Sequence, residues 1–374
     1  MSGDGASLAV DAFRVTMDHT RDASGLSELV KDGRLNPDDI IAVTGKTGGF
    51  DDTYNSSRVD ADQAVRRFLL DHGTRPADVV EEIPMAFSAG VGTIMTPHLV
   101  VFTRTESEPA ADGLPRLAFG SASSETILPE WIGSTRHVEA NAQAVRDAAA
   151  DGAMDPSDVE FVIGKSYYPA LDEIDAARTA GASIPEMTPQ EIFYFSSGSA
   201  ANGVRVAVDG APMPRAEEIG TNPALWSDKV AVSSNAWEGV GGESPSSHLL
   251  ALGNRQGAGG RLRIGRAVFE DLLDIGAVTR AVRNAGLEVG DGPLPPEISS
   301  RIVASYIKYG EPVDGLFRGR RLVTEDPSYV KNLKTVVASA FSAMLQDNMI
   351  WISAGGKQQG PPGGGTLAIV LDVS

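Results

Sequence analysis

The sequence predicts an α+β protein in which three homologous strand–helix–strand units are arranged with internal pseudo-threefold symmetry around a central pocket. One motif recurs in each third of the chain and ends at a lysine, and a second motif recurs downstream around a serine. The 374 residues also include 41 glycines and 22 prolines, which favours many tight turns over long helical bundles. Each unit is too small to hide every face of its own sheet, so packing three together buries the inner faces.

The first motif combines a Pro-containing loop, an acidic residue and an apolar strand that leads to lysine. DGRLNPDDIIAVTGK ends at Lys46 and DGAMDPSDVEFVIGK ends at Lys165, with the same spacing throughout. A more divergent copy, GDGPLPPEISSRIVASYIK, ends at Lys308. Three copies in matching order indicate an internal repeat.

The second motif is an apolar strand, a serine, small residues, a glycine-rich loop and another apolar strand. It reads PMAFSAGVGTIMTPHLVVFT around Ser88, KVAVSSNAWEGVGGESPSSHLLALG around Ser234 and MIWISAGGKQQGPPGGGTLAIVLD around Ser353. The middle unit has the longest segment between lysine and serine, which predicts an insertion in the Pro-rich stretch 185–214.

Short Val- and Ile-rich runs such as IIAVTG, VEFVIG and LAIVLD predict the strands. Apolar residues at helical spacing in ADQAVRRFLLDHG, which ends at Gly73, and in ASAFSAML predict helices between lysine and serine. Polar Gly/Pro-rich linkers lie at ESEPAADGLP and GNRQGAGG. They divide the chain into units at 1–105, 113–251 and 257–374.

Composition excludes several classes of protein. The formal net charge is −18, which opposes binding to nucleic acid or anionic membranes, and no apolar run approaches the roughly 18 residues of a membrane span. The absence of cysteine excludes disulfides, thiolate nucleophiles and Cys-ligated metal sites. The N-terminus lacks the basic start and apolar core of a signal peptide, so we expect a cytoplasmic protein.

Familiar catalytic motifs are incomplete. GKT at 45–47 and GKS at 164–166 resemble the end of a P-loop, but Ile40 and Val159 stand where a P-loop needs glycine. The five histidines lack HExxH spacing, and no GxSxG elbow occurs. A P-loop phosphotransferase is therefore disfavoured, and nothing in the spacing supports a Ser–His–Asp triad.

Lysine plus serine, three times over, is the remaining chemical pattern. A lysine amine can take the proton of a serine hydroxyl if its pKa is lowered, and ammonium groups that converge on one axis lower it. Backbone N–H groups of the small residues after each serine could bind an oxyanion. A solubilising lysine at a strand end and a plain turn explain one copy equally well, but three matched copies favour chemistry.

These residues resemble those of the ring-opening cyclic amide hydrolases, which include cyanuric acid hydrolase and barbiturase. The resemblance covers essentially the whole chain through VTGKTGG, FSAGVGTIMTPH, VIGKS, VSSNA and, most specifically, ISAGGKQQGPPGGG. It implies a homotetramer that hydrolyses a six-membered cyclic imide or ureide (EC 3.5.2 type) without a catalytic cofactor.

The resemblance also implies roles for individual residues. The second unit carries the nucleophile and its base, which map to Ser234 and Lys165. The implied substrate-binding residues are Lys46, Arg58, Ser88, Ala89, Ser197, Asn235, Lys308, Lys334, Ser353 and Ala354.

Three of these positions depart from the family. An arginine is expected in each unit; Arg58 matches, but Ser197 and Lys334 occupy the other two positions, and Asn235 follows the presumed nucleophile in place of glycine. A guanidinium fork is not replaced by serine and only partly by lysine. We therefore expect barbituric acid or another less symmetric ring in preference to cyanuric acid. A non-catalytic protein that binds a small planar ligand is the alternative of another class.

The family further implies a structural divalent metal in the third unit. Carbonyl-rich oxygen ligation suits Mg²⁺ or Ca²⁺, although a simple Gly-Pro turn explains the same residues. The expected ligands are Glu311, Gly356, Gln359, Gly360, Pro361 and Gly364.

Overall fold

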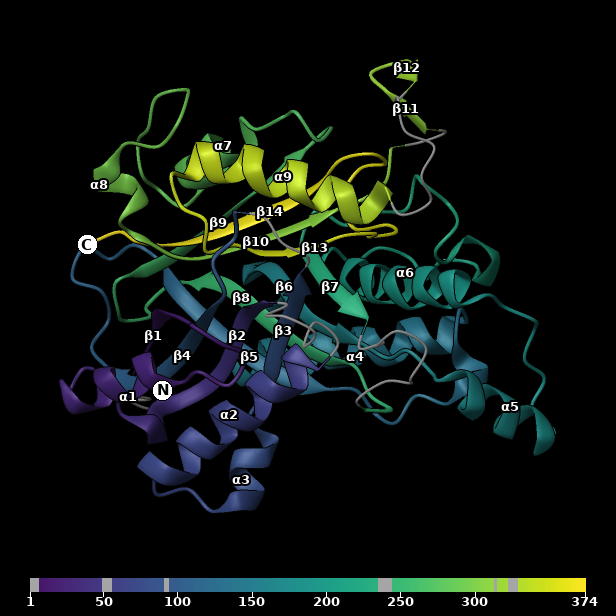
Figure 1. Ribbon diagram of the computed structural model, residues 1–374, viewed down its shortest axis with the longest axis horizontal. Coiled ribbons are helices and arrows are strands. Elements are labelled where there is room, and N and C mark those ends of the chain that lie inside the picture. The colour runs from purple at the N-terminus through teal and green to yellow at the C-terminus, as the bar shows by residue number, and fades with distance from the viewer. Residues whose placement is uncertain (1–6, 49–55, 91–93, 235–243, 313–314, 322–328) are drawn as a thin grey trace, which may run out of the picture.

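The computed structural model shows a mixed α/β protein with three four-stranded sheets, drawn in Figure 1. It describes residues 7–48, 56–90, 94–234, 244–312, 315–321 and 329–374. The sheets take their strands from residues 7–107, 116–255 and 262–372, which we call units A, B and C. The exact unit boundaries predicted from the linkers stay a prediction.

Unit A contains one sheet and three α-helices in the described residues. Its elements are β1 (Ser7–Thr16), α1 (Ser24–Lys31), β2 (Ile40–Gly48), α2 (Ser57–His72), α3 (Ala77–Glu82), β3 (Met85–Gly90) and β4 (His98–Ser107).

Unit B follows the same sheet plan and also has three α-helices in the described residues, and its α5 lies before the stretch 185–214 in which the insertion was predicted. Its elements are β5 (Arg116–Ser123), α4 (Thr135–Asp151), β6 (Val159–Ser166), α5 (Leu171–Thr179), α6 (Pro189–Val208), β7 (Val230–Ser234) and β8 (His248–Arg255).

Unit C adds a small hairpin, β11–β12, before its last helix. Its elements are β9 (Leu262–Phe269), α7 (Ala277–Asn284), α8 (Pro296–Ser299), β10 (Ile302–Tyr309), β11 (Leu316–Phe317), β12 (Arg320–Arg321), α9 (Tyr329–Leu345), β13 (Trp351–Ser353) and β14 (Gly365–Asp372).

The three sheets have one topology, which confirms the predicted repeat. In each unit the first strand pairs with the fourth, the fourth with the second, and the second with the third. The second and third strands are parallel and the other pairings are antiparallel. In units A and B the Pro–Asp part of the first motif forms the same structure, a 3₁₀ turn at Pro37–Asp39 and Pro156–Asp158 directly before the lysine strand.

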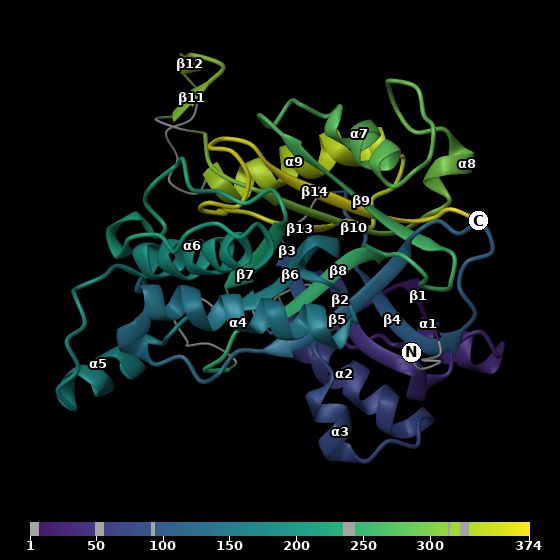
Figure 2. The same ribbon diagram turned by 180° about the vertical axis from the view of Figure 1, so that it is seen from behind.

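The inner faces of the sheets meet in one central core, and helices cover the outer faces (Figures 1 and 2). The central core combines residues of all three units, among them Phe102, Phe161 and Tyr306. Separate clusters form under α2 in unit A, under α4 and α6 in unit B, and under α7 and α9 in unit C. Within the described part of the chain, no helix has the length and apolarity needed to cross a bilayer.

Candidate active site

Each lysine of the first motif lies within a row of four residues that crosses its sheet. The strand register gives the rows Thr16–His98–Lys46–Ser88, Ser123–His248–Lys165–Ser233 and Val268–Thr366–Lys308–Ser353. Residues paired directly across strands share a face of the sheet. The lysine and serine of each motif are thus neighbours on one face, although they lie far apart in the sequence.

Alternation along the strands shows which face the rows occupy. Ala86, Ala231 and Trp351 lie two residues before Ser88, Ser233 and Ser353, and all three belong to the central core. Because side chains alternate along a strand, the three serines also point toward the centre. The rows therefore face the region where the three sheets meet.

In unit B the residue in this position is Ser233, whereas the sequence motif predicted Ser234 as nucleophile. Ser234 pairs with Ser166, whose hydroxyl lies 2.6 Å from that of Ser196 on α6. Val232, two residues before Ser234, packs in the cluster under α4 and α6. The register therefore aligns Ser233, not Ser234, with Ser88 and Ser353, and it turns Ser234 toward the helices.

The unit A pair is completed by a strand of unit C. The Lys46 amine donates to the Ala89 carbonyl at 2.8 Å and lies 3.4 Å from the Ser88 hydroxyl. Ser88 in turn donates to the carbonyl of Ile352 at 2.7 Å. Ile352 directly precedes Ser353, so the pairs of units A and C are joined through one peptide group.

The unit C pair is also hydrogen-bonded and fully buried. The Lys308 amine donates to the Ser353 hydroxyl at 3.0 Å and to the Ala354 carbonyl at 3.2 Å. The ring of Phe193, from α6 of unit B, lies 5.7 Å from the same amine. The predicted positions of Ala89 and Ala354 thus touch the lysines through their carbonyl groups.

The unit B serine differs from the other two. The Ser233 hydroxyl oxygen is buried and has no hydrogen-bond partner among the described residues. Its neighbour in the row, Lys165, is buried at 4% exposure but lines a cavity. A buried hydroxyl without a partner is costly, and of the three row serines Ser233 alone is in this state among the described residues.

Burial and nearby positive charges lower the pKa values of Lys46 and Lys308. Burial lowers the pKa of Lys46 far below its ordinary value, and the positive charges of Lys334, Lys165 and Arg58 lower it further. Burial, followed by the charge of Lys334, lowers the pKa of Lys308 to about 7. Cations of all three units therefore lie within electrostatic range of each other, as the convergence hypothesis requires.

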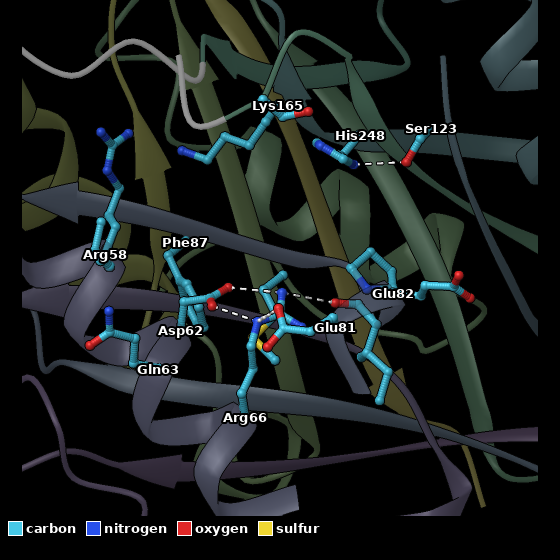
Figure 3. Close-up of a pocket in the computed structure, with 15 residues that line it drawn as sticks. Arg58, Asp62, Gln63, Arg66, Glu81, Glu82, Phe87, Ser123, Lys165 and His248 are labelled. Carbon is cyan, nitrogen blue, oxygen red and sulfur yellow. Dashed lines mark hydrogen bonds and ion pairs between the residues drawn. The ribbon is translucent and has the colours of Figure 1, made fainter. Parts of the chain in front are cut away.

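A cavity of about 910 Å³ lies between units A and B (Figure 3). Lys165, His248 and Ser123 form its unit B side, and α2 together with residues 81–87 forms its unit A side. The His248 ring is held by a 2.8 Å hydrogen bond to the Ser123 hydroxyl. In Figure 3 the side chain of Lys165 extends toward the side on which Arg58 lies.

The three positions at which the resemblance implies arginine lie on helices α2, α6 and α9, but differ in their surroundings. Arg58 shares the cavity with Lys165, and Lys334 is buried within electrostatic range of Lys46 and Lys308. Ser197 is wholly buried, and its hydroxyl accepts hydrogen bonds from Gln359 Nε2 at 2.8 Å and from the Lys357 N–H at 3.0 Å. Asn235 lies outside the described residues.

Gln359 connects the glycine-rich loop of unit C to the serine strand of unit B. Its Oε1 accepts from the Val232 N–H at 2.8 Å, and its Nε2 donates to the Val232 carbonyl at 2.9 Å. The amide thus pairs with the peptide groups of the residue before Ser233. Gly198 permits the backbone of Gly220 to approach α6, since a Cβ there would lie 2.6 Å from the Gly220 Cα and 2.8 Å from Gln358 Oε1.

Some residues of the expected metal site suit a hard cation. A Cβ on Gly310 would lie 3.2 Å from the Gly356 carbonyl and 3.8 Å from that of Gly364, so glycine leaves a space faced by oxygens beside Glu311. The Tyr194 hydroxyl lies 3.3 Å from the Glu311 carboxylate. The Gln359 side chain does not fit this set, because its amide is committed to Val232 and Ser197. No cluster of three or more His, Cys, Asp or Glu occurs among the described residues.

Comparison with known proteins places this arrangement in a family. A family profile described as amidohydrolase ring-opening protein matches residues 11–372. This chain belongs to that family. A barbiturase of Nocardioides sp. is 32% identical over 98% of this chain and 99% of its own length. A cyclic amide hydrolase of Azorhizobium caulinodans is 31% identical over 97% and 100%, respectively.

Solved structures agree with the ring-opening amidohydrolase assignment. A cyanuric acid hydrolase described as an evolutionary innovation by structural concatenation is 28% identical, with a TM-score of 0.85 over 98% of this chain and 100% of that one. A cyanuric acid hydrolase from A. caulinodans gives a TM-score of 0.83 at 27% identity, with 98% and 100% coverage. The family resemblance and the three-unit fold predicted from sequence are confirmed.

Motif inspection missed three features of this ring-opening amidohydrolase site. Ser233 follows from the two-residue alternation that also sets Ala86–Ser88, a signal present in the sequence. The histidines of the rows, His98 and His248, occupy matching places after the glycine-rich loops. The role of the Gln359 amide had no sequence signal, because it depends on how units B and C pack.

Proposed function

We propose that this chain hydrolyses one ring amide bond of a six-membered cyclic imide or ureide through Ser233 and Lys165. The observation that carries the proposal is the set of three equivalent rows whose lysine and serine face one core. Curated relatives named barbiturase and cyclic amide hydrolase support the same reaction class.

In the proposed reaction Lys165 takes the Ser233 proton as the hydroxyl oxygen attacks a ring carbonyl. Backbone N–H groups at the serine ends of the strands stabilise the oxyanion. Collapse breaks the C–N bond, and the ring nitrogen takes the proton from Lys165. Water then releases the acyl group as a carboxylate and restores the serine. Lys46 with Ser88 and Lys308 with Ser353 hold and polarise the other ring carbonyls.

We favour a barbiturate-like ring over cyanuric acid. Cyanuric acid has three equivalent edges and suits three equivalent donors. Here Arg58, Lys334 and Ser197 occupy the equivalent positions, and the Ser197 hydroxyl is committed to the unit C loop. Cyanuric acid is the alternative substrate.

The experiment compares Ser233→Ala, Ser234→Ala and Lys165→Ala with barbituric and cyanuric acid, with ring opening followed by mass spectrometry. We expect Ser233→Ala and Lys165→Ala to lose turnover and Ser234→Ala to retain it. Full activity in Ser233→Ala together with loss in Ser234→Ala would return the nucleophile to Ser234. Full activity in Lys165→Ala would show that Lys165 is not the general base.

A non-catalytic binder of a planar ligand is the second candidate, and the missing arginine at Ser197 is the observation that favours it. Incubation with the same rings separates the two functions, because only an enzyme adds the mass of one water to the ligand.

The remaining expectations are proposals of the same kind. We propose a homotetramer in the cytoplasm that binds no nucleic acid or membrane, consistent with the net charge of −18. We also propose a structural Mg²⁺ or Ca²⁺ near Glu311, Gly356 and Gly364. Metal analysis of purified protein, with Glu311→Ala as comparison, tests the ion.

A further inference from the structure

The cavity between units A and B lies beside the three Lys–Ser pairs rather than among them. Of the described residues of the centre, Lys165 and Arg58 line it, whereas Lys46, Lys308, Ser88 and Ser353 do not. A ring held by the unit A and unit C pairs would therefore present only its unit B edge to the cavity. That edge carries the carbonyl attacked by Ser233 in the proposed function.

The cavity is larger than a bare six-membered ring requires. Its volume of about 910 Å³ falls in the range of roughly 300–1,000 Å³ that is typical of pockets for drug-sized ligands. The unit A wall supplies the apolar side chains of Val59, Ile83, Pro84, Met85 and Phe87. The space thus offers apolar contact to a group attached to the ring.

Acidic residues predominate among the charged side chains of the unit A wall, where Asp62, Glu81 and Glu82 line the cavity with Arg66. Arg66 forms a 2.6 Å ion pair with Asp62 and a 3.5 Å ion pair with Glu81, and it also donates to the Val80 carbonyl at 2.6 Å. The Ser123 and His248 side chains are bonded to each other (Figure 3). The cationic groups of Lys165 and Arg58 lie at the ring end of the cavity, and the arginine of this wall, Arg66, is paired with carboxylates.

We propose that the substrate carries an uncharged apolar substituent, an alkyl or aryl group on a ring atom next to the attacked carbonyl, and that this group lies in the cavity between units A and B. This inference rests on the proposed function and adds the substrate class. Beside Lys308 the ring of Phe193 lies 5.7 Å from the amine and Gln359 is bonded to Ser197, whereas Lys165 lines the cavity, so the substituent has its place at the unit B edge.

The test compares kcat/KM for barbituric acid with that for its 5-ethyl, 5-phenyl and 1-ethyl derivatives, with ring opening scored by mass. We expect at least one substituted ring to exceed barbituric acid on the order of tenfold, since each buried CH₂ group adds about fourfold to binding. Opening of barbituric acid at least as fast as every substituted ring overturns this inference and leaves the proposed function standing. No ring opening at all overturns the proposed function, and this inference with it.

A matched pair of variants locates the substituent. Val59 and Leu70 are exposed positions of the same helix, at 38% and 45% exposure, but only Val59 lines the cavity. We expect Val59→Trp to reduce the preference for the substituted ring at least fivefold and Leu70→Trp to leave it unchanged. An unchanged preference in Val59→Trp, or an equal loss in both variants, overturns the placement.

Discussion

The two interfaces A–B and B–C, which we call seams, each place the lysine of one row near a helix of the preceding unit, but the residues around that lysine are packed differently. At the B–C seam the ring of Phe193 of α6 lies beside the Lys308 amine, and Gln359 of the unit C loop donates a hydrogen bond to Ser197 of α6. At the A–B seam Lys165 meets the open cavity that it shares with Arg58.

The difference shows how one repeated design yields residues with distinct tasks. Ser88 and Ser353 are held in hydrogen bonds with lysine, which suits a fixed contact to a carbonyl. Ser233 has no partner among the described residues and lies beside the lysine that borders the cavity. Four predictions break or sharpen this contrast, ordered from the largest expected effect to the smallest.

The largest expected effect is a difference in kcat between variants of Lys165 and of Lys308. Lys165→Met removes the proposed base and is expected to reduce kcat on the order of a thousandfold, within the range for general-base loss. Lys308→Met removes two buried hydrogen bonds, to the Ser353 hydroxyl and to the Ala354 carbonyl, and is expected to lower kcat about tenfold. Steady-state kinetics on the best ring of the panel measures both. A greater loss in Lys308→Met would move the base to the B–C seam.

The second prediction concerns stability against pH at the closed seam. The pKa of Lys308 is lowered to about 7 by burial and by Lys334, whereas an unfolded lysine titrates near 10.4. Between these values the unfolded chain binds more protons, so the free energy of unfolding rises with pH.

The increase in the free energy of unfolding between pH 7 and 10 should therefore be smaller in Lys308→Met, by on the order of 4 kcal/mol. Urea unfolding at both pH values measures it. Buried tyrosines such as Tyr306 titrate in both proteins, so the difference between the two curves isolates Lys308. Parallel curves would show that Lys308 keeps its proton.

The third prediction concerns His98, which occupies in the unit A row the place that His248 occupies in the unit B row. Burial lowers the pKa of His98 to about 4, against 6.5 in an unfolded chain. Stability gained by the neutral ring is complete above pH 6.5 and is lost as pH falls toward 4. His98→Gln should remove about 3 kcal/mol of this acid dependence in urea unfolding. An unchanged dependence would assign the acid sensitivity to other groups.

The fourth prediction tests the Gln359 amide with its neighbour as control. Gln359→Leu leaves the Val232 peptide groups without their partner and should lower kcat about tenfold and the free energy of unfolding by about 2 kcal/mol. Gln358 instead bonds Asn202, Gly220 and the carbonyls of Glu218 and Asn222.

Gln358→Leu should therefore lose similar stability with an unchanged kcat. Equal kcat in both variants would show that the loop holds the fold and does not position the Ser233 strand.

Much of the fold was readable from the sequence, because the same apolar strand, loop and lysine recur in one order. The pairing of Lys46 with Ser88 and of Lys308 with Ser353 followed from that repeat. The alignment of Ser233, rather than Ser234, with Ser88 and Ser353 was not predicted, because two adjacent serines match a motif equally well and only the alternation of faces separates them. The state of Ser197 could not be predicted, since its partners come from a loop that lies far away in the sequence and reaches α6 only after units B and C pack.

The carbonyl of Ile352 accepts the Ser88 hydroxyl of another unit, and this contact has an evolutionary consequence. Unit A carries its own lysine and serine, but the carbonyl that accepts the Ser88 hydroxyl belongs to unit C. A copy of unit A on its own would leave Ser88 without this acceptor. With the units joined in one polypeptide, their sequences can diverge as long as the unit C strand that carries the Ile352 carbonyl stays beside Ser88.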